Sequence, residues 1–134
     1  LFLEYPPKSL KGLKRKPIKQ IQQLCSQYDF EFAIGHRYQA TYILRNVKNL
    51  PVIGINHSFG KFKRFTRRWF VNYHKKNLYF LGVSNAIRDE MRVALPRFPK
   101  EQIQTLYNRI NVEQVLSGQL DAAQARQFLG ISAD

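Results

Sequence analysis

The chain has 134 residues, of which 44% are hydrophobic, and a formal net charge of +13 at pH 7. This length and composition are typical of one packed domain and exclude an intrinsically disordered chain. Cys25 is the only cysteine, which excludes an intramolecular disulfide, and no apolar run approaches the roughly 20 residues of a membrane span. We therefore expect a soluble or peripheral protein of a reducing compartment.

The positive charge is concentrated in the middle of the chain. Lys and Arg number 22 against 9 Asp and Glu, and no acidic residue lies between Glu31 and Asp89. A surface that repels itself in this way is typical of proteins that bind anions, namely nucleic acid, an anionic membrane or phosphorylated substrates. The charge alone does not choose among these three.

The first half of the chain alternates between strand and helix patterns. Residues 1–5 indicate a short strand, which ends at Pro6 and Pro7. A helix is predicted over 17–28, with Pro17 as its first residue and Cys25 on its apolar face, hence in the core. The segments "FEFAIG" (30–35) and "PVIGIN" (51–56) have the length and residue types of strands, and "YQATYILRNV" (38–47) between them has helical spacing.

The second half continues this alternation. "NLYFLGVS" (77–84) predicts a buried strand, and the helix over 85–95 that follows has Ser84 or Asn85 as its cap and ends at Pro96. "QIQTLYN" (102–108) predicts another strand. The last helix, over 121–131, has Asp121 and Gln124 at capping-box spacing.

Four alternations of strand and helix predict an α/β fold. The strands are continuous apolar runs, which is typical of strands covered on both faces. We therefore expect a three-layer, Rossmann-like parallel sheet with right-handed crossovers.

Polar and basic residues follow the predicted strands, where parallel sheets bind their ligands. Imidazoles and amides suit sugar hydroxyls, and arginines suit phosphates. The alternative is that loop ends are polar in any protein and that two of these residues only cap a helix. The candidate substrate-binding residues are His36, Arg37, Asn56, Ser58, Ser84, Asn85, Asn108 and Arg109.

No metal site and no glycine-rich phosphate loop is predicted. The three histidines, His36, His57 and His74, have no cysteine or carboxylate at ligand spacing.

The segment 61–76 predicts an amphipathic helix. Five aromatic residues share one arc of a helical wheel, Phe62, Phe65, Trp69, Phe70 and Tyr73, whereas cations fill the other. Such a helix suits an anionic membrane surface, but its aromatic face could equally pack on the sheet, and the two interpretations are compatible. The residues predicted to face the membrane are Lys61, Lys63, Arg64, Arg67, Arg68, Trp69 and Lys75. Nucleic acid is the rival partner, although no RNP-like or helix-turn-helix motif is present.

Four segments in this order give the chain a resemblance to a known family. "FAIGHR", "PVIGINH", "LYFLGVSNAIRDEM" and "IQTLYNRINVE" resemble the amino-terminal domain of retaining GT-B glycosyltransferases of family 4, over about residues 28–131. The resemblance implies a nucleotide-sugar-dependent transferase that needs no other cofactor. His57 matches the histidine that lies beside the transferred sugar and supports the transfer, so the resemblance implies that His57 is catalytic. Ser84 matches the serine at the head of the next helix, and Asn108 matches the asparagine of an NGID-like turn. Arg109 and Asn111 depart from that turn, where the family has Gly and Asp.

The resemblance also implies how this chain relates to an enzyme. Residues 1–118 would form the acceptor-side domain, and 119–134 a helix and the start of a linker to a donor-binding domain outside this sequence. The family's first strand would precede residue 1, so we expect these 134 residues to be inactive alone. The expected partners are a nucleotide-sugar donor, a lipid-linked or phosphorylated saccharide acceptor and the anionic inner face of the cytoplasmic membrane, in lipopolysaccharide or surface-polysaccharide synthesis. The alternative is a nucleic-acid-binding module without catalytic activity.

Overall fold

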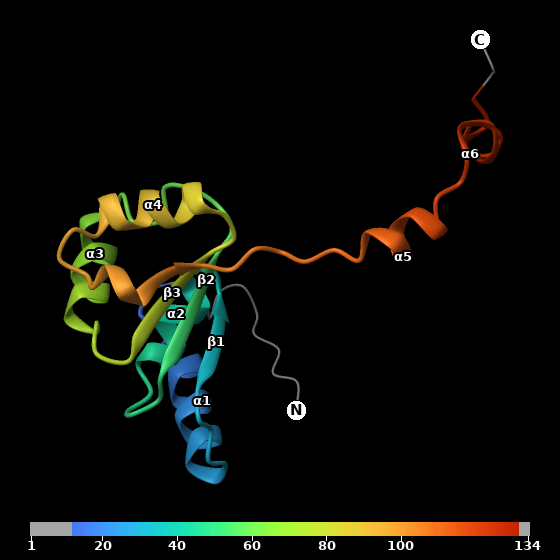
Figure 1. Cartoon of the computed structure of the whole chain (residues 1–134). Helices are drawn as coiled ribbons and strands as arrows, with labels where there is room; N and C mark the ends of the chain where they lie inside the picture. Colours follow the sequence, from blue (N-terminus) through green and yellow to red (C-terminus); the bar gives the residue numbers. More distant parts are fainter. Residues whose placement is uncertain (1–11, 132–134) are drawn as a thin grey trace.

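A computed structural model describes residues 12–131, and within them the protein is an α/β fold around one parallel sheet (Figure 1). The strands are β1 (Ala33–His36), β2 (Val52–Asn56), β3 (Leu78–Gly82) and β4 (Ile103–Thr105), in the order β1-β2-β3-β4. All three strand pairs are parallel. This confirms the predicted Rossmann-like open sheet, while the strand predicted over 1–5 lies outside the described residues.

Helices connect the strands as the sequence predicted, with shifted ends. They are α1 (Arg15–Gln27), α2 (Arg37–Arg45), α3 (Phe65–Tyr73), α4 (Asn85–Ala94), the short 3-10 helix η2 (Lys100–Gln102), α5 (Val112–Ser117) and α6 (Ala122–Leu129). The helix predicted over 61–76 is shorter than expected, and α5 was not predicted. Within residues 12–131, no helix has both the length and the hydropathy to cross a membrane.

The hydrophobic core lies on one face of the sheet. Val52, Leu78, Phe80 and Ile103 project from the strands into a single cluster that also holds residues of α3 and α4, with side chains of α2 against it. Right-handed crossovers that step through the sheet in one direction place their helices on the same face. Figure 1 agrees, since β1, β2 and β3 stand in front of α2.

The opposite face of the sheet is partly open, so the described residues form two layers and not the predicted three. Ile34 and Tyr79, which share this face, are 50% and 43% exposed. The continuous apolar runs misled the prediction because this open face also carries apolar residues, namely Ile34, Ile53 and Tyr79. The apolar pattern therefore reflects two apolar faces, of which residues 12–131 cover one.

Helix α2 lies unusually close to the sheet. A Cβ atom added to Gly35 would come within 2.7 Å of the Thr41 backbone nitrogen, and one added to Gly54 within 2.8 Å of Thr41 Oγ1. Thr41 is 1% exposed, and its hydroxyl donates to the carbonyl of Arg37 at 3.2 Å. Only glycine on both strands permits this contact, which fixes the height of α2 above β1 and β2.

Helix α1 packs beside α2 and is less buried than the sequence predicted. Pro17 is its only buried residue, and Cys25 is half-buried, so the placement of Cys25 in the core was wrong. Burial raises the pKa of the Cys25 thiol, which keeps it protonated. The apolar face of α1 therefore contacts α2 over part of its length and is exposed to solvent over the rest.

After β4 the chain leaves the packed domain. Residues 106–124 are all exposed, and Figure 1 shows α5 and α6 on a segment that extends away from the sheet. The predicted capping box is confirmed, since Asp121 Oδ1 accepts from the Gln124 backbone N–H at 2.8 Å and the Gln124 side chain accepts from the Asp121 N–H.

The glycine contact predicts a large cost for one added methyl group. Gly54→Ala should lower the free energy of unfolding by about 1–3 kcal/mol, because the new Cβ meets both Thr41 and Phe80. The matched control is Gly118→Ala, whose Cβ would meet no atom closer than 3.7 Å. Urea unfolding of both variants measures the difference, and equal stabilities would contradict the close approach of α2.

Candidate functional site

Two histidines meet at the carboxyl ends of neighbouring strands. His36 ends β1, and His57 follows the last residue of β2. The Nδ1 atom of His36 lies 3.2 Å from Nε2 of His57, and the rings stack with their centroids 5.5 Å apart. One nitrogen must donate the hydrogen of this bond and the other must accept it. The exposed pair can therefore hold a proton between the rings and offer its outer nitrogens to a ligand.

Arg37 makes a strained junction directly after His36. Its φ angle is 68°, in the left-handed region, which costs a residue with a side chain roughly 1–2 kcal/mol. The strain lets β1 pass into α2 without a loop, so the exposed Arg37 side chain and the His36 ring stay at the sheet edge. Strained backbone that the surrounding structure maintains is common at functional sites.

Two buried side-chain oxygens, of Asn56 and Glu90, have no hydrogen-bond partner within the described residues. Asn56 is 3% exposed, and its Oδ1 atom is unpaired. The Oε1 atom of Glu90, in α4, accepts from the Gly60 N–H at 3.1 Å, while its Oε2 atom is unpaired. Unpaired buried oxygens are costly and mark places where a ligand or water can bind.

Glu90 was missed by the sequence analysis. Its hydrogen bond holds the turn that carries Ser58, whose side chain is exposed. The only signal in the sequence was that Glu90 stands next to Asp89, the first acid after a long basic stretch.

Ser84 and Asn85 lie at the N-terminus of α4, and both side chains already make hydrogen bonds within the domain. The Ser84 hydroxyl accepts from the Ile87 N–H at 3.3 Å, which confirms its predicted role as the helix cap. The Asn85 Oδ1 atom accepts from Arg88 at 3.0 Å and from the Thr105 hydroxyl at 2.9 Å. The Ser84 hydroxyl hydrogen and the Asn85 amide hydrogens remain to donate to a ligand.

Asn108 and Arg109 lie apart from this group. Both are exposed, beyond the end of β4, on the segment that leads away to α5. The structure thus brings together the predicted site residues at the ends of β1, β2 and β3. It places Asn108 and Arg109, the predicted site residues after β4, outside the packed domain.

The aromatic residues of the basic segment do not share one face. Phe62 and Phe70 are buried in the core, whereas Phe65, Trp69 and Tyr73 are 59–73% exposed. The predicted single aromatic arc was therefore wrong, because the core occupies the side of α3 that carries Phe70 and Val71. Trp69 and Tyr73 stack on each other, with ring centroids 5.6 Å apart, and form an aromatic ridge with Phe65 on the outer side of α3.

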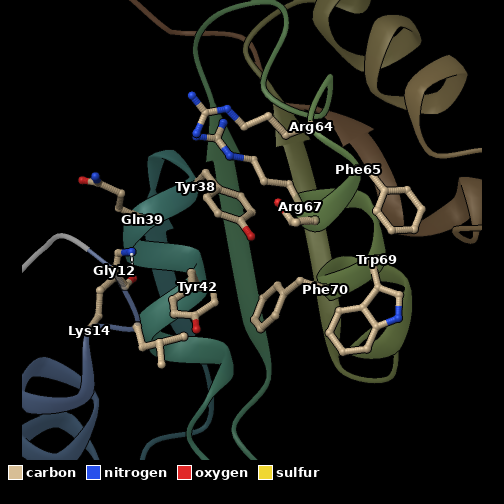
Figure 2. Close-up of a pocket in the computed structure, with 12 residues that line it drawn as sticks. Gly12, Lys14, Tyr38, Gln39, Tyr42, Arg64, Phe65, Arg67, Trp69 and Phe70 are labelled. Carbon is tan, nitrogen blue, oxygen red and sulfur yellow. Dashed lines mark hydrogen bonds between the residues drawn. The ribbon is translucent and has the colours of Figure 1, made fainter.

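The basic segment also contributes to a pocket of about 720 Å³ between α2, α3 and residues 12–14 (Figure 2). Its aromatic wall consists of Tyr38, Tyr42 and Phe70. Arg67 lies over the Tyr38 ring at 4.6 Å, and the Lys14 ammonium lies over the Tyr42 ring at 4.9 Å. We call this site the basic pocket. Its lining residues are Gly12, Leu13, Lys14, Tyr38, Gln39, Tyr42, Arg64, Phe65, Thr66, Arg67, Trp69 and Phe70, and none of them is acidic.

The electrostatics of the basic pocket favour an anion. The pKa of Tyr38 is raised to about 12, mainly because the side chain is partly buried. The phenol therefore stays neutral and can donate a hydrogen bond. The pKa of Lys14 is lowered, first by burial and then by the positive charge of Arg67. The cations thus repel each other, and an anion bound between them would relieve that repulsion.

The other predicted basic residues surround this pocket without lining it. Lys63, Arg68 and Lys75 are exposed, and Lys61 is half-buried, with its carbonyl accepting from Arg67 at 2.9 Å. Within residues 12–131, no three His, Cys, Asp or Glu side chains gather where they could hold a metal ion.

Comparisons with protein-family models, with curated proteins and with solved structures found no match.

The histidine contact predicts a change in the NMR spectrum of one ring when the other is removed. In long-range ¹H–¹⁵N spectra, His57→Ala should shift both ring nitrogens of His36, because the shared hydrogen bond is lost. His74, at the end of α3, should keep its signals. An unchanged His36 ring would show that the two imidazoles do not touch in solution.

Proposed function

We propose that this chain is the acceptor-side domain of a nucleotide-sugar-dependent, retaining glycosyltransferase of GT-B architecture. The observation that carries the proposal is the contact of His36 with His57 at the carboxyl ends of two adjacent parallel strands. This is the edge at which open α/β sheets bind ligands. The resemblance of "PVIGINH" and "VSNAIRDEM" to family 4 supports the same assignment. The donor would bind to a second domain outside these 134 residues.

His57 has the central chemical role in this proposal. Its imidazole orients the transferred sugar or stabilises charge at the anomeric carbon, and His36 fixes the ring through their shared hydrogen bond. His36 is thus a positioning residue for His57. The donor's own phosphate assists the departure of the leaving group and the entry of the acceptor hydroxyl.

The neighbouring polar groups suit a saccharide acceptor. The Ser84 hydroxyl and the Asn85 amide can still donate, and the exposed hydroxyl of Ser58, just beyond the end of β2, can both donate and accept. A sugar hydroxyl both donates and accepts, so a mixed set of this kind can hold several hydroxyls at once. Arg37 adds a cation at the same edge for an anionic group of the substrate.

The proposed catalytic role of His57 predicts a loss of turnover. In an enzyme that carries this chain with its donor-binding domain, His57→Ala should lower kcat by roughly 100-fold or more, because removal of one preorganised group that stabilises charge in the transition state typically costs about this much. Near-UV circular dichroism should show an unchanged fold, since the side chain is exposed. Turnover close to that of the wild type would remove His57 from the mechanism.

We further propose that the enzyme works at the inner face of the cytoplasmic membrane, in lipopolysaccharide or surface-polysaccharide synthesis. The aromatic ridge of Phe65, Trp69 and Tyr73 is exposed, and the same stretch of chain carries the exposed cations Arg64, Arg68 and Lys75. Rings of this kind enter the headgroup layer, while each cation near an anionic surface adds on the order of 1 kcal/mol.

Peripheral membrane binding predicts salt-sensitive sedimentation with vesicles. The chain should bind phosphatidylglycerol vesicles at low salt and lose binding at high salt, with little binding to phosphatidylcholine. Trp69→Ser should weaken binding, whereas Tyr107→Ser should not, although both side chains are 59% exposed in the wild type. Equal binding to anionic and neutral vesicles would remove the membrane from the proposal.

A further inference from the structure

The basic pocket is a second site, separate from the paired histidines. It lies on the helix side of the domain, between the first turns of α2 and α3. Because crossover helices begin at the carboxyl edge of a parallel sheet, the pocket and the histidine pair lie at the same end of the molecule. Tyr38, in its wall, follows His36 by only two residues.

Within residues 12–131, no acidic side chain forms an ion pair with the cations of the pocket, which are held by aromatic rings and carbonyl groups. Arg67 rests on Tyr38 and donates to the Lys61 carbonyl at 2.9 Å, and Lys14 donates to the Gly12 carbonyl at 2.9 Å. Cation–π contacts and neutral carbonyls orient a cation but leave its charge uncompensated. Figure 2 shows Arg64 pointing to the same end of the pocket as Arg67, near Tyr38. Two guanidinium groups so placed suit phosphate oxygens, which arginine binds through paired N–H groups.

The apolar surface beside these cations points to what is attached to the phosphate. The aromatic wall leads outward to Phe65 and Trp69, which line the pocket and belong to the exposed aromatic ridge. A hydrophilic phosphate ester would leave this ridge in water, whereas a hydrocarbon chain would cover it and gain roughly 25 cal/mol for each Å² buried. Nucleic acid fits less well, because Trp69 and Tyr73 already stack on each other and each ring has one face left for a base.

We infer that the basic pocket binds the phosphate head of a lipid, with the phosphate between Lys14, Arg64 and Arg67 and the hydrocarbon along Phe65 and Trp69. The inference rests on the proposed function, which it deepens by naming the acceptor as a saccharide joined through phosphate to a lipid. The pocket holds the phosphate link, and the sugar extends to the strand ends.

Trp69 provides a direct measurement, because it is the only tryptophan of the chain and lines the pocket. Farnesyl diphosphate, kept below its aggregation concentration, is titrated into the full chain while tryptophan emission is recorded. We expect saturable binding and a shift of tryptophan emission to shorter wavelength, because the hydrocarbon displaces water from the indole ring of Trp69. Inorganic pyrophosphate should bind at least about tenfold more weakly, since it lacks the apolar part.

The decisive variants are a matched pair on one segment. Arg64→Gln should weaken farnesyl diphosphate binding about tenfold, as expected for the loss of one charged hydrogen bond. Arg64 lines the pocket, and within the described residues its side chain makes no hydrogen bond that the fold would lose. Arg68→Gln removes the same charge four residues later, outside the pocket, and should change the affinity less than about twofold.

Four results would overturn the inference. Absence of saturable binding would exclude a lipid-phosphate site. Equal weakening of farnesyl diphosphate binding by Arg64→Gln and Arg68→Gln would show that only the net charge of the chain matters. Pyrophosphate binding as tight as that of farnesyl diphosphate would make this a site for free phosphates. Displacement by a single-stranded oligonucleotide at physiological salt would make it a nucleic-acid surface. Because no transfer is measured, these results are independent of the turnover of His57→Ala.

Discussion

The contact of Thr41 with Gly35 and Gly54 is the constraint on which the other features of this domain depend. It brings α2 onto β1 and β2 at a distance that no residue with a Cβ allows. The backbone must then pass from β1 into α2 without a loop, and Arg37 takes up the strain with a φ of 68°. His36 is left at the very end of β1, within hydrogen-bond distance of His57. The close packing of α2 on β1 and β2 thus accounts for the two glycines, for the strained backbone of Arg37 and for the contact between the two imidazoles.

The same placement of α2 creates the basic pocket. Tyr38 and Tyr42 face α3, where Phe70 packs against Tyr42 with ring centroids 4.6 Å apart. Arg67 lies over the Tyr38 ring and Lys14 over the Tyr42 ring, so cation–π contacts hold both cations in position. Two sites of different chemistry therefore lie at one end of the domain. The first has imidazoles and amides, which suit hydroxyl groups, and the second has cations and aromatic rings, which suit the lipid phosphate that we propose.

The order of strands and helices was predictable because it depends on local periodicity and on caps such as Ser84 and Asp121. That His36 and His57 lie at the same edge of the sheet followed from the predicted parallel strands, whereas their hydrogen bond depends on the packing of α2. The number of layers was not predictable, since apolar residues such as Ile34 and Tyr79 also occupy the face that residues 12–131 leave partly open. The direction of each aromatic in α3 depended on which side the core would take, and a helical wheel does not contain that information. Glu90 and the basic pocket arise from contacts between distant segments, so no local pattern could reveal them.

The central claim is that one phosphorylated, lipid-linked saccharide spans both sites. It is tested most directly by amide chemical-shift mapping of the ¹⁵N-labelled chain with a short prenyl-diphosphate monosaccharide. The signals of His36 and His57 should move together with those of Arg64 and Arg67, with one shared affinity. Shifts confined to α3, with the strand ends unchanged, would contradict it, because the sugar would then not reach the proposed catalytic edge.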